Sequence, residues 1–351
     1  MKKDHLLIIR FSALGDVAMA VPVVYALAHQ YPDLRITVLS RSFARPFFED
    51  LAPNVGFMEA DLKREYHGVK GLNALYRRLA AKQFTHVADL HNVLRSDFLR
   101  IRFNLGSYKV AHINKHRIGR RRLTSSISRR LIQQPTSFQN YAEVLAQLGF
   151  PIKMNFHSIF PKGGGDLSQL SDLAMGKINI GIAPFAAHKG KEYPLPLMQQ
   201  VIKQLTTKYP EAKIFLFGQG KKEDEQFPLW CNQYQQCVHV SKHLESIKQE
   251  LILMSHLDVM LSMDSANMHL ASLVATPVVS VWGPTHPYAG FMGWNQDPAN
   301  AIQVDLDCRP CSIFGQKACH RGDLACMNRI APETIVEHIN QILSLKNKLK
   351  Q

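Results

Sequence analysis

The sequence lacks any long apolar run. In the opening stretch HLLIIRFSALGDVAMAVPVVYALAHQYP, Arg10, Asp16 and Pro22 interrupt the apolar residues, and no uninterrupted run reaches ten. A signal peptide needs about 7–15 apolar residues and a membrane span about 20, whereas a buried parallel strand needs only about 4–8. We therefore interpret the stretch as a strand, a Gly-containing loop and a helix, and we expect the chain to stay in the cytoplasm.

Cysteine is also scarce, with six in 351 residues, which excludes a secreted scaffold built on disulfides. Four of them lie close together in CRPCSIFGQKACHRGDLACM, namely Cys308, Cys311, Cys319 and Cys326. Two cysteines two residues apart suit a zinc site, but the interval before Cys319 is short and the final pair lacks that spacing. We favour a folded loop of buried, reduced thiols, keep structural zinc as the alternative, and expect no cofactor.

Acidic residues are rare in one part of the chain. Residues 61–130 contain 17 Lys and Arg against 4 Asp and Glu, an excess of 13 in a chain whose net charge is +14. Such a stretch is either a solvated basic face without a partner or a binding site for an anionic partner. That partner would be an acidic lipid surface, a phosphorylated substrate or nucleic acid. Its densest piece, KHRIGRRRLTSSISRR (115–130), lacks interleaved aromatic residues, and no nucleic-acid-binding signature is present, which argues against nucleic acid.

What the chain does contain is a repeated alternation of apolar runs and helical patterns. This alternation predicts an α/β protein with two doubly wound parallel sheets, each covered on both faces. The expected strands are 5–12, 35–40, 55–60, 86–91 and 109–113, then 177–185, 212–218, 237–241, 258–264 and 277–283. The expected helices are 17–30, 71–82, 94–104, 119–132 and 139–149, then 195–208, 222–234, 245–256 and 266–274.

Glycine and proline mark the division between the two halves. PKGGGDLS (161–168) predicts a linker, so we expect domains at 1–162 and 169–330 with a cleft between them. The final segment, 331–351, is expected to form an amphipathic helix that packs back toward the N-terminal domain. The apolar residues on one face of that helix are Ile335, Ile339, Ile342 and Leu345.

Asp16 follows Gly15 at the carboxyl end of the first expected strand, where an α/β sheet presents its working residues. A carboxylate there repels phosphate, so it suits a general base or a group that binds a hydroxyl. The alternative is a helix cap, which Asp also provides well. The stretch alone leaves both interpretations open.

The strongest local pattern is VMLSMDSANMHLASL, followed by VSVWGPTHP. A buried strand ends at Asp264, and the helix after it offers unsatisfied N–H groups and the positive end of its dipole to a diphosphate. The carboxylate of Asp264 suits a ribose or sugar hydroxyl. The alternative is a plain capped helix with a core histidine. The candidate donor-binding residues here are Asp264, Ser265, Ala266, Asn267, His269, Gly283 and Thr285.

Two further loops follow strands of the second half. HKGKEYP (188–194) places Lys191 where a mobile cation suits the charge that develops on a leaving diphosphate. FGQGKKEDE (217–225) lacks the third glycine of a dinucleotide fingerprint, so a simple tight turn is the better interpretation.

In combination, IRFSALGDVAMAVPVV, KGKEYP, MDSANMHLASL…PVVSVWGPTHP and CRPC…C…CM resemble the ADP-heptose:lipopolysaccharide heptosyltransferases of glycosyltransferase family 9. The resemblance covers essentially the whole chain. It implies a GT-B fold, with the acceptor held mainly by the first domain and the nucleotide sugar by the second. The catalytic aspartate of the family falls on Asp16, its phosphate-binding lysine on Lys191, and its donor motif on Asp264, Ser265, Ala266 and His269.

The family usually has Gly where this chain has Ala266, and Trp where it has Tyr193. Both departures leave the reaction type intact and the exact donor open. The expected reaction is an inverting, metal-independent transfer from ADP-heptose to an anionic lipid-linked glycan, with the basic stretch on the inner membrane surface. Residues expected to contact the acceptor are Ser12, Gly15, Arg120, Arg121 and Arg122.

Three alternatives remain open at this point. The chain could transfer a different nucleotide sugar on the same fold, bind nucleic acid through residues 61–130, or bind glycans without catalysis. The joint presence of Asp16 and Lys191 argues against the last of these.

Overall fold

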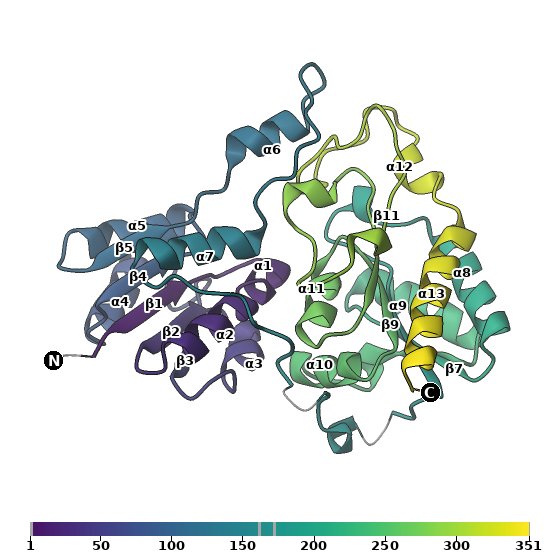
Figure 1. The fold of residues 1–351 in the computed structure, drawn as a ribbon, viewed down its shortest axis with the longest axis horizontal. Coiled ribbons are helices and arrows are strands. Elements are labelled where there is room, and N and C mark those ends of the chain that lie inside the picture. The colour runs from purple at the N-terminus through teal and green to yellow at the C-terminus, as the bar shows by residue number, and fades with distance from the viewer. Residues whose placement is uncertain (1–2, 161–162, 171–172, 351) are drawn as a thin grey trace. The chain divides into compact units, whose positions relative to one another are not determined.

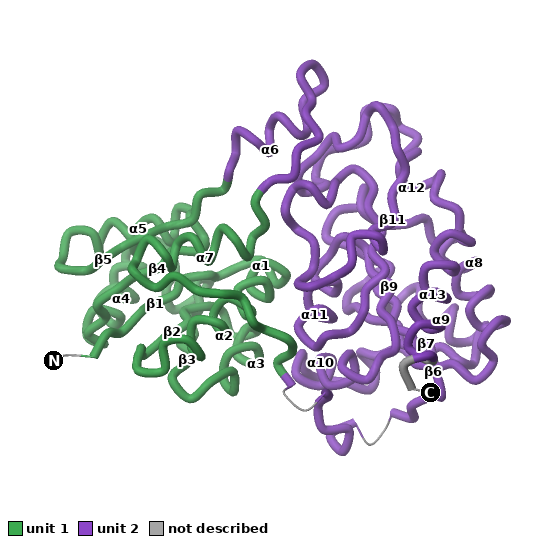
Figure 2. Tube along the Cα trace, viewed as in Figure 1, with its two compact units in different colours: residues 1–115, 135–159 green, residues 116–134, 160–351 purple. Residues whose placement is uncertain are grey.

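The computed structural model describes residues 3–160, 163–170 and 173–350 (Figure 1). The chain forms two compact units (Figure 2). Unit 1 comprises residues 1–115 and 135–159, and unit 2 comprises residues 116–134 and 160–351. The expected linker begins at residues 161 and 162, which lie outside the described residues. Within the described ranges, no helix is both long and apolar enough to cross a membrane.

Unit 1 is built on a parallel sheet in the order β3-β2-β1-β4-β5. All five residues of β1 are buried, because LLII is covered on both faces of the sheet. The five strands predicted for this half are confirmed, four of them with shorter carboxyl ends and β2 with the predicted bounds. They are β1 (His5–Ile9), β2 (Arg35–Ser40), β3 (Val55–Glu59), β4 (His86–Asp89) and β5 (Lys109–His112).

The expected helix 17–30 is two helices, α1 (Leu14–Ala18) and α2 (Val21–Gln30). Pro22 explains the break, because it has no N–H to donate and its ring excludes the carbonyl of Ala18. A short α3, with Pro in its first turn, was not predicted. The remaining helices of unit 1 are α3 (Arg45–Phe48), α4 (Gly68–Ala80), α5 (Leu94–Asn104) and α7 (Ser137–Gln147).

Unit 2 contains a second parallel sheet, in the order β11-β10-β9-β6-β7-β8. Its five predicted strands are confirmed, and a sixth, only two residues long, was too short to predict. The strands are β6 (Ile178–Ala183), β7 (Ala212–Leu216), β8 (Cys237–His239), β9 (Val259–Met263), β10 (Val278–Val281) and β11 (Ala301–Ile302).

Helices and short 3-10 turns connect these strands. The helices are α6 (Arg117–Leu123), α8 (Leu195–Lys208), α9 (Lys221–Gln233), α10 (Ile247–Ser255), α11 (Ala266–Leu273), α12 (Ala325–Asn328) and α13 (Pro332–Lys350). The 3-10 turns of the chain are Ser42–Ala44, Leu167–Leu170, Lys189–Lys191, Val240–Lys242, Pro287–Ala289 and Pro298–Asn300.

A second helix prediction needs correction. The helix expected at 119–132 ends at Leu123, because the Ser125 hydroxyl accepts hydrogen bonds from the backbone N–H groups of Ile127 and Ser128 and so competes with helix formation. The terminal helix α13 packs on α8, β9 and β10 within unit 2. Ile335 and Ile339 lie in the core of that unit, whereas Leu345 is 62% exposed.

Both sheets reverse their strand order at one place, between β1 and β4 in unit 1 and between β6 and β9 in unit 2. In doubly wound sheets, ligands bind beyond the carboxyl ends of the strands at such a reversal. The loops after β1 and β4, and those after β6 and β9, are therefore where functional side chains are expected.

Candidate active site

Asp16 lies in the loop region after β1, at the third position of helix α1. Its Oδ2 accepts a hydrogen bond from the Ala13 N–H at 3.2 Å, so the carboxylate does cap the start of the helix. The side chain is nevertheless 33% exposed. Capping and a role toward a ligand are therefore compatible, because capping leaves part of the carboxylate accessible.

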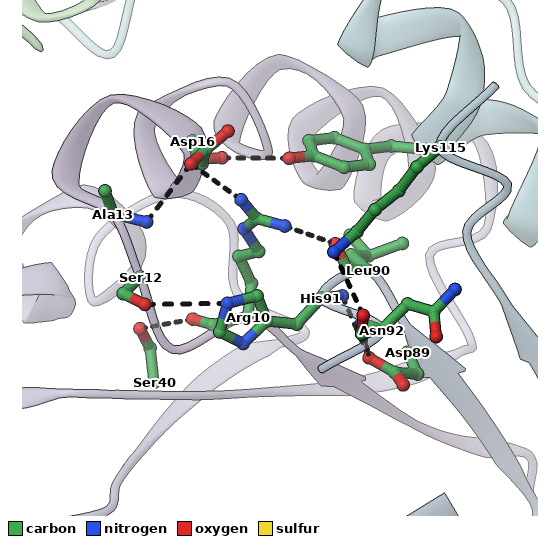
Figure 3. A network of polar contacts seen from close by, with 11 residues as sticks. Arg10, Ser12, Ala13, Asp16, Ser40, Asp89, Leu90, His91, Asn92 and Lys115 are labelled. Carbon is green, nitrogen blue, oxygen red and sulfur yellow. Dashed lines mark hydrogen bonds and ion pairs between the residues drawn. The ribbon is translucent and has the colours of Figure 1, made fainter. Parts of the chain in front are cut away.

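Arg10 holds this carboxylate from below (Figure 3). Its Nη2 lies 2.8 Å from Asp16 Oδ2, and its Nη1 donates to the Leu90 carbonyl at 2.7 Å. Burial lowers the pKa of Arg10, but Tyr141 and Asp16 more than offset burial and leave the pKa above its ordinary value. In the sequence, Arg10 stands out only as an interruption of an apolar run. A charged residue at the end of a buried strand was the available signal.

A second group of polar side chains follows β4, on the other side of the reversal. Asp89 accepts hydrogen bonds from the N–H groups of His91 (2.8 Å) and Asn92 (2.9 Å), and Nε2 of His91 lies 3.5 Å from the Ser12 hydroxyl (Figure 3). Within the described residues, Oδ2 of Asp89 and Nδ1 of His91 have no hydrogen-bond partner. Ser12, a predicted acceptor contact, thus lies beside residues that sequence analysis missed.

His91 is a neutral imidazole. Burial lowers its pKa to about 3, and the positive charges of Arg10 and Lys115 act in the same direction. Lys115 is fixed nearby, donating from Nζ to the Asn92 carbonyl at 2.9 Å. The loop after β4 therefore contributes polarity but no positive charge from His91.

We expect the His91→Gln variant to lose less stability on acidification than the wild type. Between pH 6.5 and 3 the unfolded chain binds a proton at His91 that the native state does not. The free energy of unfolding of the wild type therefore decreases as the pH is lowered, by up to about 1.4 kcal/mol per pH unit. Urea unfolding at pH 7, 5.5 and 4 measures the difference. His29→Gln, at an exposed histidine, is the control. Equal pH slopes for wild type and His91→Gln would contradict the assignment.

In unit 2, Asp264 and Lys191 meet at the reversal of the sheet. Asp264 follows β9 and is buried, and Lys191 ends a 3-10 turn after β6. The Lys191 ammonium lies 2.9 Å from Oδ2 of Asp264, and the Thr285 hydroxyl donates to the same oxygen at 2.8 Å. Three predicted donor-binding residues from three separate loops thus form one hydrogen-bonded cluster.

Helix α11 begins directly after this cluster. Ser265 is its N-cap residue, and no hydrogen bond from that side chain satisfies the first N–H groups. Ala266 is the first helical residue and does not have positive φ, so replacing the usual Gly causes no backbone strain here. Ser265, Ala266 and Asn267 are half-buried, whereas His269 is buried one turn further.

The segment 303–330, which we call the cysteine segment, holds the loop after β10. Arg309 donates to the carbonyl oxygens of Gly283 and Thr285, and the N–H groups of Cys311 and Ser312 donate to Pro284 at 3.0 and 3.1 Å. Gly283 and Thr285 were predicted, but their support by Arg309 was not. A buried arginine in a loop has no spacing signature in the sequence.

The cysteine segment also contacts Lys191. A Cβ atom at Gly315, where φ is +81°, would lie 2.4 Å from Cδ of Lys191. Only glycine therefore fits, both for its backbone conformation and for the close approach of the lysine stem. The segment positions the cation as well as the loop that supplies Thr285.

The four cysteines of this segment carry free thiols and line one narrow cavity together with Arg309 and His320. Burial raises the pKa of Cys326 to about 11 and also raises that of Cys311. Across the part of the chain that the structure describes, no three His, Cys, Asp or Glu side chains are arranged to hold a metal ion.

The predicted arginines and the other acceptor candidates belong to different units. Arg120, Arg121 and Arg122 are in α6, which groups with unit 2, whereas Ser12 and Gly15 are in unit 1. The Arg120 guanidinium lies 4.5 Å from the centre of the Phe291 ring, while Arg121 and Arg122 are exposed.

The family model described as glycosyltransferase family 9 (heptosyltransferase) matches residues 72–318. Lipooligosaccharide heptosyltransferase 2 of Campylobacter jejuni is 22% identical over 342 residues, covering 94% of this chain and 96% of its own length.

Two solved structures are similar over almost their whole length. The E. coli ADP-heptose lps heptosyltransferase II has a TM-score of 0.69 at 17% identity, covering 98% of this chain and 99% of its own. The family 9 glycosyl transferase from Veillonella parvula has a TM-score of 0.72 at 17% identity, covering 98% of each chain. These likenesses show a shared fold and confirm the GT-B class. With the family model matching well over half of its residues, the chain belongs to glycosyltransferase family 9, the heptosyltransferases.

Proposed function

We propose that this glycosyltransferase moves a heptose from ADP-heptose to the inner core of a lipopolysaccharide or lipooligosaccharide acceptor, with inversion at the anomeric carbon. The observation that carries the proposal is the Asp16 carboxylate, partly exposed and held by Arg10 where the unit 1 sheet reverses. Asp16 takes the proton from an acceptor hydroxyl as that oxygen attacks the anomeric carbon. The glycosidic bond to the diphosphate breaks, and ADP leaves.

The donor side of the proposal rests on unit 2. Lys191 and the N–H groups at Ser265, Ala266 and Asn267 stabilise the charge on the leaving diphosphate, as preorganised donors do at developing charge. An ammonium has three N–H donors, so Lys191 keeps donors for phosphate while it contacts Asp264. Asp264 binds a ribose or sugar hydroxyl. No step of this mechanism is assigned to a metal.

The acceptor and location follow from charge. The relatives are named for lipopolysaccharide or lipooligosaccharide. We therefore propose an anionic lipid-linked glycan as the acceptor. Residues 61–130, with their excess of 13 positive charges, suit such an acceptor and the anionic inner face of the cytoplasmic membrane. We place the protein in the cytoplasm, peripherally attached to that face, with Arg121 and Arg122 toward the acceptor and nucleic acid not among its partners.

Thermal unfolding with a panel of nucleotide sugars tests the donor assignment. ADP-heptose at about 100 times its dissociation constant adds about 2.7 kcal/mol, which raises the melting temperature by roughly 5–10 °C at about 2–4 °C per kcal/mol. UDP- and GDP-sugars at the same concentration should leave it unchanged. A shift with UDP- or GDP-sugars alone would support the alternative of a different nucleotide sugar on the same fold.

A further inference from the structure

Residues 117–132, which we call the α6 hairpin, consist of α6 and the loop after it, seen beyond α6 in Figure 1. The Arg130 N–H donates to the Arg122 carbonyl at 3.3 Å and closes this loop. Inside it, the Ser125 hydroxyl accepts hydrogen bonds from the N–H groups of Ile127 (3.3 Å) and Ser128 (3.0 Å). Ile127 is therefore held in a turn at the end of the hairpin.

The hairpin exposes aliphatic side chains that a water-facing loop would not need. Ile127 is 97% exposed, Ile118 is 73% exposed, and Leu131 and Ile132 are 52% and 58% exposed. Single exposed hydrophobic residues are ordinary on protein surfaces, but four within fifteen residues are not scattered singly. Four exposed aliphatic side chains this close together indicate a surface that an apolar environment covers.

The sequence around these side chains carries positive charge and contains no acidic residue. No Asp or Glu occurs between Asp97 and Glu143, and the exposed arginines of the hairpin are Arg117, Arg121, Arg122 and Arg130. Interspersed arginine and aliphatic side chains are complementary to an anionic bilayer. The lipid phosphates attract the guanidinium groups, and the acyl-chain boundary accommodates the aliphatic side chains. Nucleic acid would instead favour aromatic residues for stacking, and the hairpin has none.

The base of the hairpin is fixed to unit 2. Arg129 donates to the carbonyl oxygens of Asp307 and Arg309, and the Gln134 N–H donates to the Tyr288 carbonyl at 2.8 Å. Arg120 stacks on Phe291. These contacts fix both α6 and the segment that follows the loop. The exposed side chains are therefore presented by a loop whose base is held in place.

We propose that the α6 hairpin inserts Ile127, with Ile118, Leu131 and Ile132 beside it, into the interface of an anionic membrane. Arg121, Arg122 and Arg130 then lie at the level of the lipid phosphates. This rests on the proposed function in that the acceptor is carried by a membrane, and it names the element that reaches that membrane. Attachment is separate from donor binding, which unit 2 supplies through Lys191 and Asp264.

Sedimentation of the full-length protein with vesicles tests the insertion. With vesicles of phosphatidylethanolamine and phosphatidylglycerol, Ile127→Asp should bind about 10- to 100-fold more weakly than wild type, since burying one isoleucine contributes about 1.5–3 kcal/mol. Leu229→Asp, at a 61% exposed leucine on α9, is the matched control and should bind like wild type. Pure phosphatidylcholine vesicles should bind the wild type weakly.

The arginines give an independent arm. Arg121→Gln with Arg122→Gln should weaken binding by about 5-fold per charge and reduce its salt dependence, whereas Lys203→Gln with Lys208→Gln, on α8, should not. Ile127→Asp binding within twofold of wild type would overturn the proposal. The proposal would also be overturned if Leu94→Asp, at an 88% exposed leucine of α5 in unit 1, lost vesicle binding while Ile127→Asp kept it. A third contrary result would be tighter binding to RNA than to vesicles, with an RNA affinity that Ile127→Asp does not change.

The same samples separate this inference from the proposed function. ADP binding by Ile127→Asp, measured by calorimetry, should match wild type. If the wild type binds ADP-heptose but no vesicles, the insertion proposal is wrong and the donor assignment stands. If it binds vesicles but no nucleotide sugar, the donor assignment is wrong and the hairpin remains a membrane contact.

Discussion

Asp16→Asn should lower the transfer rate by about 10²- to 10⁴-fold, the usual contribution of a general base, while ADP affinity stays within about twofold of wild type. The amide cannot take the acceptor proton, whereas the proposed donor contacts, with Lys191 and Asp264, belong to unit 2. Initial rates with ADP-heptose and a lipid-linked acceptor, followed by ADP release, measure the first quantity. Calorimetric titration with ADP measures the second.

The same substitution has a structural cost that must be separated from catalysis. Removing the carboxylate charge leaves the buried Arg10 without its ionic partner at 2.8 Å, which destabilises unit 1. Asp97→Asn is a matched control, because Asp97 also lies in the first turn of a helix and pairs with an arginine, Arg100, at 3.0 Å. The control should keep its turnover. Wild-type turnover in Asp16→Asn would remove the general base from the mechanism.

Lys191→Met should weaken ADP binding by about 10- to 100-fold and lower the transfer rate by about 10²- to 10³-fold. Methionine keeps the length of the aliphatic stem beside Gly315 but removes the cation that we propose for the diphosphate. It also leaves Asp264 buried with only the Thr285 hydroxyl among its described hydrogen-bond donors at Oδ2. ADP titration and steady-state rates measure both effects.

A double variant separates binding from folding. Lys191→Met with Asp264→Asn removes the uncompensated carboxylate, so stability should recover relative to Lys191→Met while ADP binding does not. Lys222→Met is the control lysine, since it pairs with the mostly buried Glu192 at 2.7 Å. Normal ADP affinity in Lys191→Met would show that the lysine serves only to neutralise Asp264.

The elements that periodicity predicts are those whose residues are buried on both faces or on one stripe. The runs LLII and VMLSM became β1 and β9 because only a covered parallel strand accommodates them. The failures are local. The Ser125 hydroxyl competes with helix formation after Leu123, and Leu345 lies outside the buried stripe of α13 that contains Ile335, Ile339 and Ile342.

The site was predictable where a residue type follows a strand. Asp16, Lys191 and Asp264 became candidates in this way, and the structure places Lys191 and Asp264 in contact. Arg10, His91 and Arg309 were not found, since each acts on a residue distant in sequence. Arg10 reaches the Leu90 carbonyl, 80 positions away, and such a pairing exists only once the strands are adjacent.

Residues 116–134 belong to unit 2 although unit 1 precedes and follows them. The backbone consequently passes between the units three times, after residues 115, 134 and 159. A shortened protein ending at residue 159 would retain Arg120 and Arg129 but lack Phe291, Asp307 and Arg309, which hold them. Isolating unit 1 therefore requires excising 116–134 and joining Lys115 to Pro135, because no single cut yields it.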